Sequence, residues 1–405
     1  MDRMYGKWRN NTEWEKKSLG VAFLGGTPYL TTETNNLNKN PYHRRNLVAY
    51  LALLRALGRV FGPAIPNTEF LISTGDEPWI LAADYGPDNP PPPVLRYCKS
   101  DSFADVLVPD MHFFTKNYSR TMLGSIRAVN RDWPWARRSA ELFGRFTPYD
   151  RTVHAQAPEL YKRGANGTEL CVAHPHCPEP PCHAGGSAGA GPHKHAHAHP
   201  DPHAADPHAP AHASSVWLSC RVREHFLDEW APGAEAAGAA LDAKSHHFHA
   251  MSHHARFKWL LNLDGVACSS RLEQLLALGG MVVKEESGYR SFYYPLLRPN
   301  EHYVPFWLKG PEEVLAVMDW AAAHDVEAAA IAAAGQRFVG HYLRPHALMC
   351  YWFTLLKEMG PLMRFTPGPQ AAARAYPHWR PVEGFMAAEG EAILRDAQFG
   401  MEFWD

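Results

Sequence analysis

A carboxylate stands directly after a short apolar segment in the first part of the chain. Residues 69–74 read EFLIST, and Gly75 and Asp76 follow them. A short apolar run that ends at glycine is typical of a buried strand. We therefore expect Asp76 at the carboxyl end of a strand, where a rigidly held carboxylate can act as a general base. A lone aspartate two residues before a proline more often forms a turn, and the spacing alone leaves that alternative open.

A second group of polar residues follows the apolar segment KWLLNLDG. Gly265 ends this segment, and Ser269, Ser270 and Arg271 precede the helical pattern LEQLLALGG. Backbone N–H groups at such a strand-to-helix turn favour an anion, and two serines with an arginine add donors for a diphosphate. The turn matches neither the glycine-rich dinucleotide fingerprint nor the Walker loop. The alternative is that one serine caps the helix and Arg271 is solvated on its first turn.

Two arginines flank a proline turn in the segment ELFGRFTPYDR. They are Arg145 and Arg151, on either side of Pro148. A pair of guanidinium groups at a turn can clamp a phosphate. The same pattern is also found in solvated loops, and the spacing does not distinguish the two.

Histidine and cysteine gather in the middle of the chain. Ten of the 24 histidines lie between His174 and His212, with three cysteines beside them: Cys171, Cys177 and Cys182. Alternating His-Ala and His-Pro tracts bind divalent metals opportunistically, but CVAHPHCPEPPCH matches no common zinc pattern. We interpret the tract as a low-complexity expansion and expect no specific metal site. A second cluster, HHFHAMSHH at residues 246–254, is expected to be a surface segment.

Alternating helical and strand patterns surround these residues. In the first part of the chain, residues 47–61 have helical spacing and end before Gly62-Pro63, and residues 105–109 form a second strand candidate. Later, FKWLLNLDGVA, SSRLEQLLALGG and MVVKEE predict a β-α-β unit with parallel strands. Residues 312–343 predict long alanine-rich helices. The pattern indicates an α/β protein with two domains, whose ligand would lie in the cleft between them.

The composition is that of a globular protein. The chain has 405 residues, 46% hydrophobic and 20% charged, and a net charge of −2. This excludes wholesale disorder, and it gives no basic field that would recruit nucleic acid. No run approaches the roughly 20 apolar residues of a membrane span, so none is expected. Seven cysteines, an odd number, do not settle the redox compartment.

One abrupt change in composition divides the chain. Between about residues 163 and 215 the sequence is rich in Pro, Gly, Ala and His and has almost no large apolar side chain. Such a segment cannot bury enough surface to offset its ordering entropy, so we expect a disordered insertion. We predict an N-terminal domain at 1–165, the insertion at 166–214, a C-terminal domain at 215–365 and a tail at 366–405.

The long segment from FKWLLNLDGVACSSRLEQLLALGG to RPNEHYVPF resembles glycosyltransferase family 90, the lipopolysaccharide-modifying and capsule-associated type that includes the animal protein O-glucosyltransferases. The likeness continues through the alanine-rich helices to HYLRPHALMCYW. Upstream, FLISTGDEPW, YCKSDSFADVLVPDMHFF and WPWARRSAELFGRFTPYDR occur in the family's order. The resemblance covers roughly residues 60–160 and 250–365.

The resemblance implies a GT-B fold, in which two Rossmann-like domains face a cleft. It implies an inverting, metal-independent transfer of glucose or xylose from a UDP-sugar to a hydroxyl of a protein or glycan acceptor, with no cofactor. By position, Asp76 matches the family's catalytic base, Gly265 to Arg271 match the loop that holds UDP, and Arg151 matches an arginine near it.

Three departures from the family's pattern concern the donor site. Gly75 stands where animal members have an arginine, and Ser291 replaces an acidic residue. Phe143 also stands in place of an arginine, for which Arg145 is expected to compensate. Family membership implies the endoplasmic reticulum or Golgi lumen, although the N-terminus as written shows no signal peptide. The alternative function is a non-catalytic homologue that binds carbohydrate or buffers metal. The oligomeric state is left open.

Overall fold

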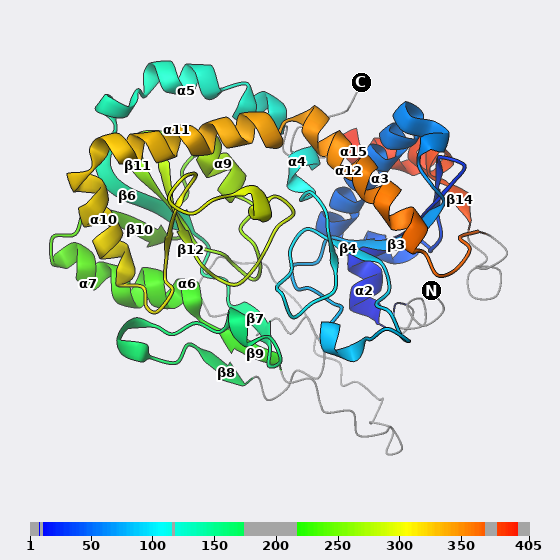
Figure 1. The fold of residues 1–405 in the computed structure, drawn as a ribbon, viewed down its shortest axis with the longest axis horizontal. Helices are drawn as coiled ribbons and strands as arrows, with labels where there is room; N and C mark the ends of the chain where they lie inside the picture. The colour runs from blue at the N-terminus through cyan, green and yellow to red at the C-terminus, as the bar shows by residue number, and fades with distance from the viewer. Residues whose placement is uncertain (1–7, 9–10, 116–117, 174–216, 369–378, 396–405) are drawn as a thin grey trace.

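The computed structural model describes residues 8, 11–115, 118–173, 217–368 and 379–395. Two lobes lie side by side, and each contains a β-sheet with helices packed on it (Figure 1). The expected mixed α/β fold is therefore confirmed. Most of the predicted insertion at 166–214 lies outside the described residues.

The first lobe contains a mixed, six-stranded sheet. Strand β1 is antiparallel to both β2 and β3, whereas β3, β4 and β5 run parallel to one another. Because parallel strands end at the same edge of a sheet, the loops after β3, β4 and β5 lie together. In spatial order the strands are β14 (Arg380–Pro381), β2 (Thr27–Leu30), β1 (Ser18–Leu24), β3 (Thr68–Ser73), β4 (Val94–Arg96) and β5 (Val106–Leu107).

Helix α3 (Pro41–Phe61) is the long core helix of this lobe. The side chain of Asn40 caps its first turn by accepting from the backbone N–H of His43. The helix ends at Phe61, and the next residue, Gly62, has a φ of 47°. Helices α12 (Pro345–Met359) and α15 (Glu391–Arg395) pack against it. Among the described residues, Pro41–Ala64 is the one helical segment long and apolar enough to cross a membrane by length and composition, and 44% of its most apolar window is buried.

The second lobe contains an all-parallel sheet of five strands. The predicted β-α-β unit is confirmed: β11 and β12 pair in parallel and α9 (Leu272–Ala277) connects them. The strand order is β10 (Leu241–Ser245), β6 (Ser139–Phe146), β11 (Phe257–Asn262), β12 (Met281–Glu285) and β13 (Val304–Phe306). The carboxyl ends of β6, β11 and β12 therefore meet at one edge.

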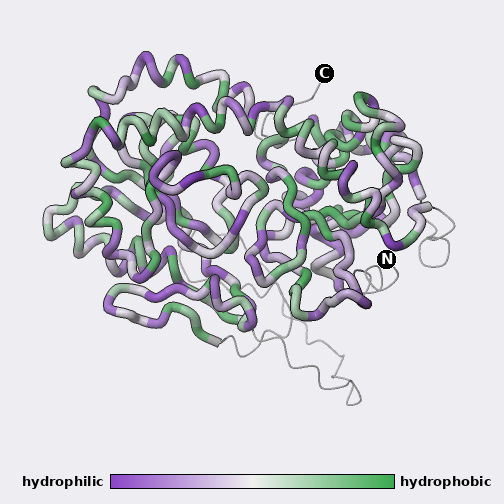
Figure 2. The backbone as a smooth tube through the Cα atoms, viewed as in Figure 1, coloured by the Kyte–Doolittle hydropathy of each residue, from purple (hydrophilic) through white to green (hydrophobic). Residues whose placement is uncertain are grey.

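Alanine-rich helices cover this sheet. The predicted region divides at His324 into α10 (Glu313–Ala323) and α11 (Asp325–Tyr342). Small residues let α11 pack closely, since a Cβ at Gly335 would lie 2.7 Å from the backbone oxygen of His302 and 2.8 Å from the side chain of Leu276. Hydrophobic residues follow the strands inside both lobes, while the outer helix α5 (Ile126–Asp132) is largely hydrophilic (Figure 2).

A small antiparallel sheet lies below the second lobe in Figure 1. Its strands are β7 (Arg151–His154), β9 (Trp217–Cys220) and β8 (Cys171–Ala173), in that order. A disulfide between Cys171 and Cys220 joins β8 to β9.

The lobes do not follow the expected boundaries at 165 and 365. Strand β6, within the predicted N-terminal domain, is an inner strand of the second lobe's sheet. After α11 the chain returns to the first lobe, where α12 packs on α3 and β14 pairs with β2. Strand pairing and helix packing, not position along the chain, decide which lobe each of these elements joins.

Candidate active site

A cavity of about 720 Å³ brings most of the predicted site residues together. The first lobe contributes Asp76 and the second contributes the whole Gly265–Arg271 loop and Arg145. Further lining residues are Lys17, Tyr42, His43, Tyr97 and His112 from the first lobe, and Tyr149, Arg223, Phe248, His249, Met251 and His254 from the second. Two other cavities, of about 610 and 680 Å³, contain none of the predicted site residues.

Asp76 lies in the loop after β3, three residues beyond the last strand residue. Its carboxylate accepts a hydrogen bond of 2.5 Å from the hydroxyl of Tyr97. Behind the loop, the fully buried Arg96 donates to the backbone oxygen of Gly75 at 2.8 Å and to that of Glu77. The same guanidinium donates to the Ser73 hydroxyl at 3.0 Å. The backbone on both sides of Asp76 is thus held by one buried cation.

Burial determines the protonation of the groups behind Asp76. It raises the pKa of Tyr97 well above its ordinary value, and the Asp76 carboxylate adds to the effect. Tyr97 therefore remains a donor to the carboxylate throughout the physiological pH range. Burial also lowers the pKa of Arg96, although Asp105 opposes this. Asp105 in turn accepts from the backbone N–H groups of Trp79 and Ile80.

A second polar group lines the same wall of the cavity. The ring Nε2 of His112 lies 3.0 Å from the Tyr42 hydroxyl, and its backbone N–H donates to Asp110 at 2.8 Å. Burial alone would raise the pKa of Asp110, but its contacts with His112 hold that pKa below the ordinary value. His43 shares a 2.9 Å hydrogen bond with the hydroxyl of Thr74.

The Gly265–Arg271 loop follows β11 and is folded around the side chain of Asp264. One carboxylate oxygen accepts from the backbone N–H of Ser269 at 2.7 Å, and the other accepts from the Ser287 hydroxyl at 2.5 Å. The residue before helix α9 is Arg271, and no side chain caps that helix. The helix-capping role considered for Ser269 and Ser270 is therefore absent, and both serines line the cavity.

Three arginines place positive charge beside this loop. Arg271 donates to the backbone oxygen of Arg145, whose own guanidinium forms an ion pair of 2.7 Å with Asp242. Arg223 donates to the backbone oxygens of Leu263, Asp264 and Thr147. Burial lowers the pKa of Arg271, and it lowers that of Arg223 to about 9. All three line the cavity, and Arg223 lies in no motif that sequence analysis identified.

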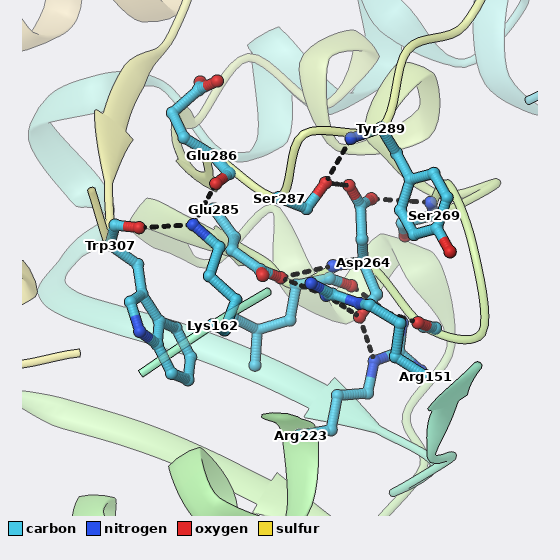
Figure 3. A network of polar contacts seen from close by, with 12 residues as sticks. Arg151, Lys162, Arg223, Asp264, Ser269, Glu285, Glu286, Ser287, Tyr289 and Trp307 are labelled. Carbon is cyan, nitrogen blue, oxygen red and sulfur yellow. Dashed lines mark hydrogen bonds and ion pairs between the residues drawn. The ribbon is translucent and has the colours of Figure 1, made fainter. Parts of the chain in front are cut away.

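Arg151 is not among the residues that line the cavity. Figure 3 shows it in a polar network with Asp264 and Glu285. It is 1% exposed, and it forms an ion pair of 2.9 Å with the buried Glu285. The same Glu285 oxygen accepts from the backbone N–H of Asp264 at 3.0 Å. Burial would lower the pKa of Arg151, but the Glu285 carboxylate raises it. Arg151 thus supports the loop through its contacts with Glu285 and with the backbone of Asp264.

The histidine segment at residues 246–254 is not only a surface segment. Its end forms the short helix α8 (Met251–His254), and both His249 and His254 line the cavity. His254 is 3% exposed, and burial lowers its pKa to about 4. The described residues contain no group of three or more His, Cys, Asp or Glu side chains that could hold a metal ion. The whole His174–His212 tract lies outside them.

Four cysteines form two disulfides, Cys98–Cys268 and Cys171–Cys220. Cys171, one of the potential zinc ligands in the sequence, is therefore not a free thiolate. Among the described cysteines, Cys350 is unpaired and exposed. Disulfides of this kind persist in oxidising compartments.

Comparison with known proteins finds similarity to a glycosyltransferase family and to individual O-glucosyltransferases. The sequence profile of glycosyl transferase family 90 matches residues 37–170 and 236–378. An O-glucosyltransferase rumi homolog of Anopheles gambiae is 37% identical over 117 residues, which is 29% of this chain and 29% of that protein. Protein O-glucosyltransferase 2 of Danio rerio is 35% identical over 112 residues, 28% of this chain and 22% of that protein.

Protein O-glucosyltransferase 1 of Homo sapiens is 32% identical over 114 residues, 28% of both chains. The chain thus matches less than a third of the length of each of these relatives. The family profile, in contrast, matches more than half of the chain and includes most residues of both walls of the cavity. The chain belongs to glycosyl transferase family 90.

Proposed function

We propose that the chain is an inverting glycosyltransferase of GT-B type that moves a sugar from a UDP-sugar to a hydroxyl of a protein or glycan. The observation that carries this proposal is the shared cavity, in which Asp76 of the first lobe lies with the Gly265–Arg271 loop of the second. Family membership supports a transferase. The names of the relatives make glucose the first donor sugar to test, and xylose is the alternative.

Asp76 is the proposed general base. Its carboxylate would remove the proton from the acceptor hydroxyl as that oxygen attacks the anomeric carbon. The bond between the anomeric carbon and the diphosphate oxygen breaks, and UDP leaves on the opposite side, so the configuration inverts. Tyr97 and Arg96 support this role, because they fix the carboxylate and the backbone around it.

The departing diphosphate would be stabilised from the second lobe. We propose that Gly265, Ser269 and Ser270 contribute donors of the loop, and that Arg145 and Arg271 contribute positive charge, with Arg223 beside them. These are permanent features of the chain, so the reaction would need no cofactor or metal. Helix α9 has only six residues, so the side chains carry most of this effect. Arg151 is proposed to act indirectly, by holding Asp264 and Glu285.

We propose the lumen of the endoplasmic reticulum or Golgi as the location, and the two disulfides support an oxidising compartment. The alternative function is a non-catalytic homologue. Retention of Asp76 together with Arg271 in one cavity favours the enzyme.

The test is an assay of the purified protein with a panel of UDP-sugars. Hydrolysis of each donor is measured first, and transfer is then measured to peptides with serine or threonine and to simple glycosides. We expect turnover of UDP-glucose or UDP-xylose, with a product of inverted anomeric configuration by NMR. An Asp76→Asn protein is the matched control. Binding of UDP without hydrolysis or transfer of any donor would instead support the non-catalytic homologue.

A further inference from the structure

The two walls of the cavity are joined by a covalent bond. Cys98 and Cys268 are 170 residues apart in sequence, and their Cα atoms lie 5.7 Å apart. Cys98 follows β4 of the first lobe, and Cys268 lies in the middle of the Gly265–Arg271 loop of the second. Both are buried, and the backbone N–H of Cys268 also contacts the sulfur of Cys98 at 3.0 Å.

Each cysteine is adjacent in sequence to a residue that organises the site. Tyr97, next to Cys98, donates to the Asp76 carboxylate. Ser269, next to Cys268, lines the cavity and donates its backbone N–H to Asp264. The disulfide therefore links the residue that holds the proposed base directly to the loop proposed to hold the diphosphate.

Other contacts between the lobes would remain without this bond. The backbones of Lys99 and Arg290 exchange two hydrogen bonds, of 3.1 and 2.7 Å. Glu159 accepts from both the backbone and the hydroxyl of Ser102. Neither contact involves the Gly265–Arg271 loop, which also reaches the first lobe through a side-chain hydrogen bond between Ser270 and Asp110. Loss of the disulfide should therefore loosen the loop relative to Asp76 and leave the lobes together.

We propose that the Cys98–Cys268 disulfide is a positioning element for glycosyl transfer. This inference rests on the proposed function. The bond supplies no atom to the reaction but fixes the donor loop against the base. The reduced protein still binds UDP through groups of the second lobe, but the sugar is held out of line with Asp76. A displacement of about 1 Å in such a site can cost roughly 10²-fold in rate.

The second disulfide provides a matched control. Cys171 and Cys220 join two neighbouring strands, β8 and β9, in the small antiparallel sheet. Neither lines the cavity, and the bond does not connect the two walls. Its removal should lower the melting temperature and leave kcat nearly unchanged.

The experiment compares Cys98→Ser/Cys268→Ser with Cys171→Ser/Cys220→Ser. In every protein Cys177, Cys182 and Cys350 are also replaced by serine, so that thiol exchange is prevented. Donor turnover gives kcat, calorimetry gives the Kd of UDP, and a thermal scan gives Tm. For the first variant we expect kcat to fall about tenfold or more while the Kd of UDP changes less than about threefold.

A second arm covers the case in which the double variant does not fold. The Cys171→Ser/Cys220→Ser protein is treated with dithiothreitol, which supplies two electrons and two protons: the Cys98–Cys268 bond breaks to two thiols and the reagent closes to its cyclic disulfide. Turnover should fall on reduction and return on reoxidation, and amide hydrogen exchange in the Gly265–Arg271 loop should rise on reduction.

Unchanged turnover after loss of the bond would overturn the inference, and so would a parallel fall in kcat, UDP affinity and Tm. A failure of the proposed function gives a different result, in which the fully oxidised protein turns over no donor at all. In that case hydrogen exchange still tests whether the bond holds the loop. If exchange in the Gly265–Arg271 loop does not change on reduction, the disulfide does not hold the loop.

Discussion

The two loops that line the cavity are held by buried charges of opposite sign. In the first lobe, the cation Arg96 donates to backbone oxygens on both sides of Asp76. In the second lobe, the carboxylates of Asp264 and Glu285 accept from backbone N–H groups of the loop that ends at Arg271. In the first lobe, a buried cation thus holds the loop that carries the Asp76 carboxylate. In the second lobe, buried carboxylates hold the loop that carries the Arg271 guanidinium.

In both lobes, the buried charges support the loops, and a different set of charged groups is available to a ligand. Arg96, Asp264 and Glu285 have their hydrogen bonds inside the protein, so their removal should damage the fold. Asp76 and Arg271 line the cavity, so their removal should damage binding or chemistry. Both loops follow strands of parallel pairs, where ligands usually bind in α/β proteins.

The largest expected effect is on stability, from Arg151→Met. This change leaves the Glu285 carboxylate buried without its ion-pair partner, which costs roughly 3–5 kcal/mol of unfolding free energy. Denaturant unfolding measures it. The control is Arg131→Met, because Arg131 forms an exposed ion pair with Asp132, and exposed pairs contribute little to stability. Equal losses in the two variants would contradict the supporting role of Arg151.

The next largest effect is on turnover, from Asp76→Asn. If Asp76 removes the acceptor proton, kcat should fall about 10²-fold or more while the affinity for the donor changes little. Asp88→Asn is the control, since Asp88 is an exposed carboxylate of the same lobe outside the cavity. If the Asp76→Asn protein has near-normal turnover, Asp76 is not the general base.

A smaller effect is expected on ligand binding, from Arg271→Ala. Loss of a charge-assisted bond to the diphosphate should weaken UDP binding by roughly 1.5–3 kcal/mol. Calorimetry with UDP measures it, and the exposed Arg298 provides an Arg298→Ala control. If both variants bind UDP as the wild type does, Arg271 does not contact the diphosphate.

Acid should destabilise the protein through His254. Burial and the nearby cations Arg271 and Arg145 keep its folded pKa at about 4, below the ordinary 6.5. The unfolded chain therefore takes up the proton first as the pH falls, and stability decreases by about 1.5 kcal/mol between pH 6.5 and 5. His254→Gln should remove this part of the pH dependence, and His341→Gln, at an exposed position, should not. Parallel pH profiles for wild type and His254→Gln would contradict it.

The smallest expected effect is that of a chelator. Because arginines and backbone donors are proposed to stabilise the leaving diphosphate, transfer should continue in excess EDTA, and added zinc should not raise kcat. If EDTA abolishes transfer and manganese or magnesium restores it, a metal replaces the arginines in this role.

Much of the site could be predicted from local sequence. Asp76 and the Gly265–Arg271 loop were identified because each follows a short apolar strand, and the family resemblance placed them in one site. Arg223 was missed because it belongs to no recognisable motif. Tyr97 lies in a block of the family resemblance and His254 in the histidine cluster expected at the surface, but neither was assigned to the site. Arg151 was identified, but the sequence did not reveal Glu285 as its partner. Burial and partners depend on residues that are far apart in the chain.

The sequence by itself determined the α/β class, the β-α-β unit from β11 to β12 and the order of the motifs. The signals for these features are the spacing of hydrophobic residues, the glycines that end helices and the turn residues, and each depends on only a few neighbouring residues. Only the tertiary structure decided that β6 joins the second sheet, that helix α12 returns to the first lobe, and that Cys98 meets Cys268. Each of these depends on contacts between segments more than a hundred residues apart, and no local pattern encodes such contacts.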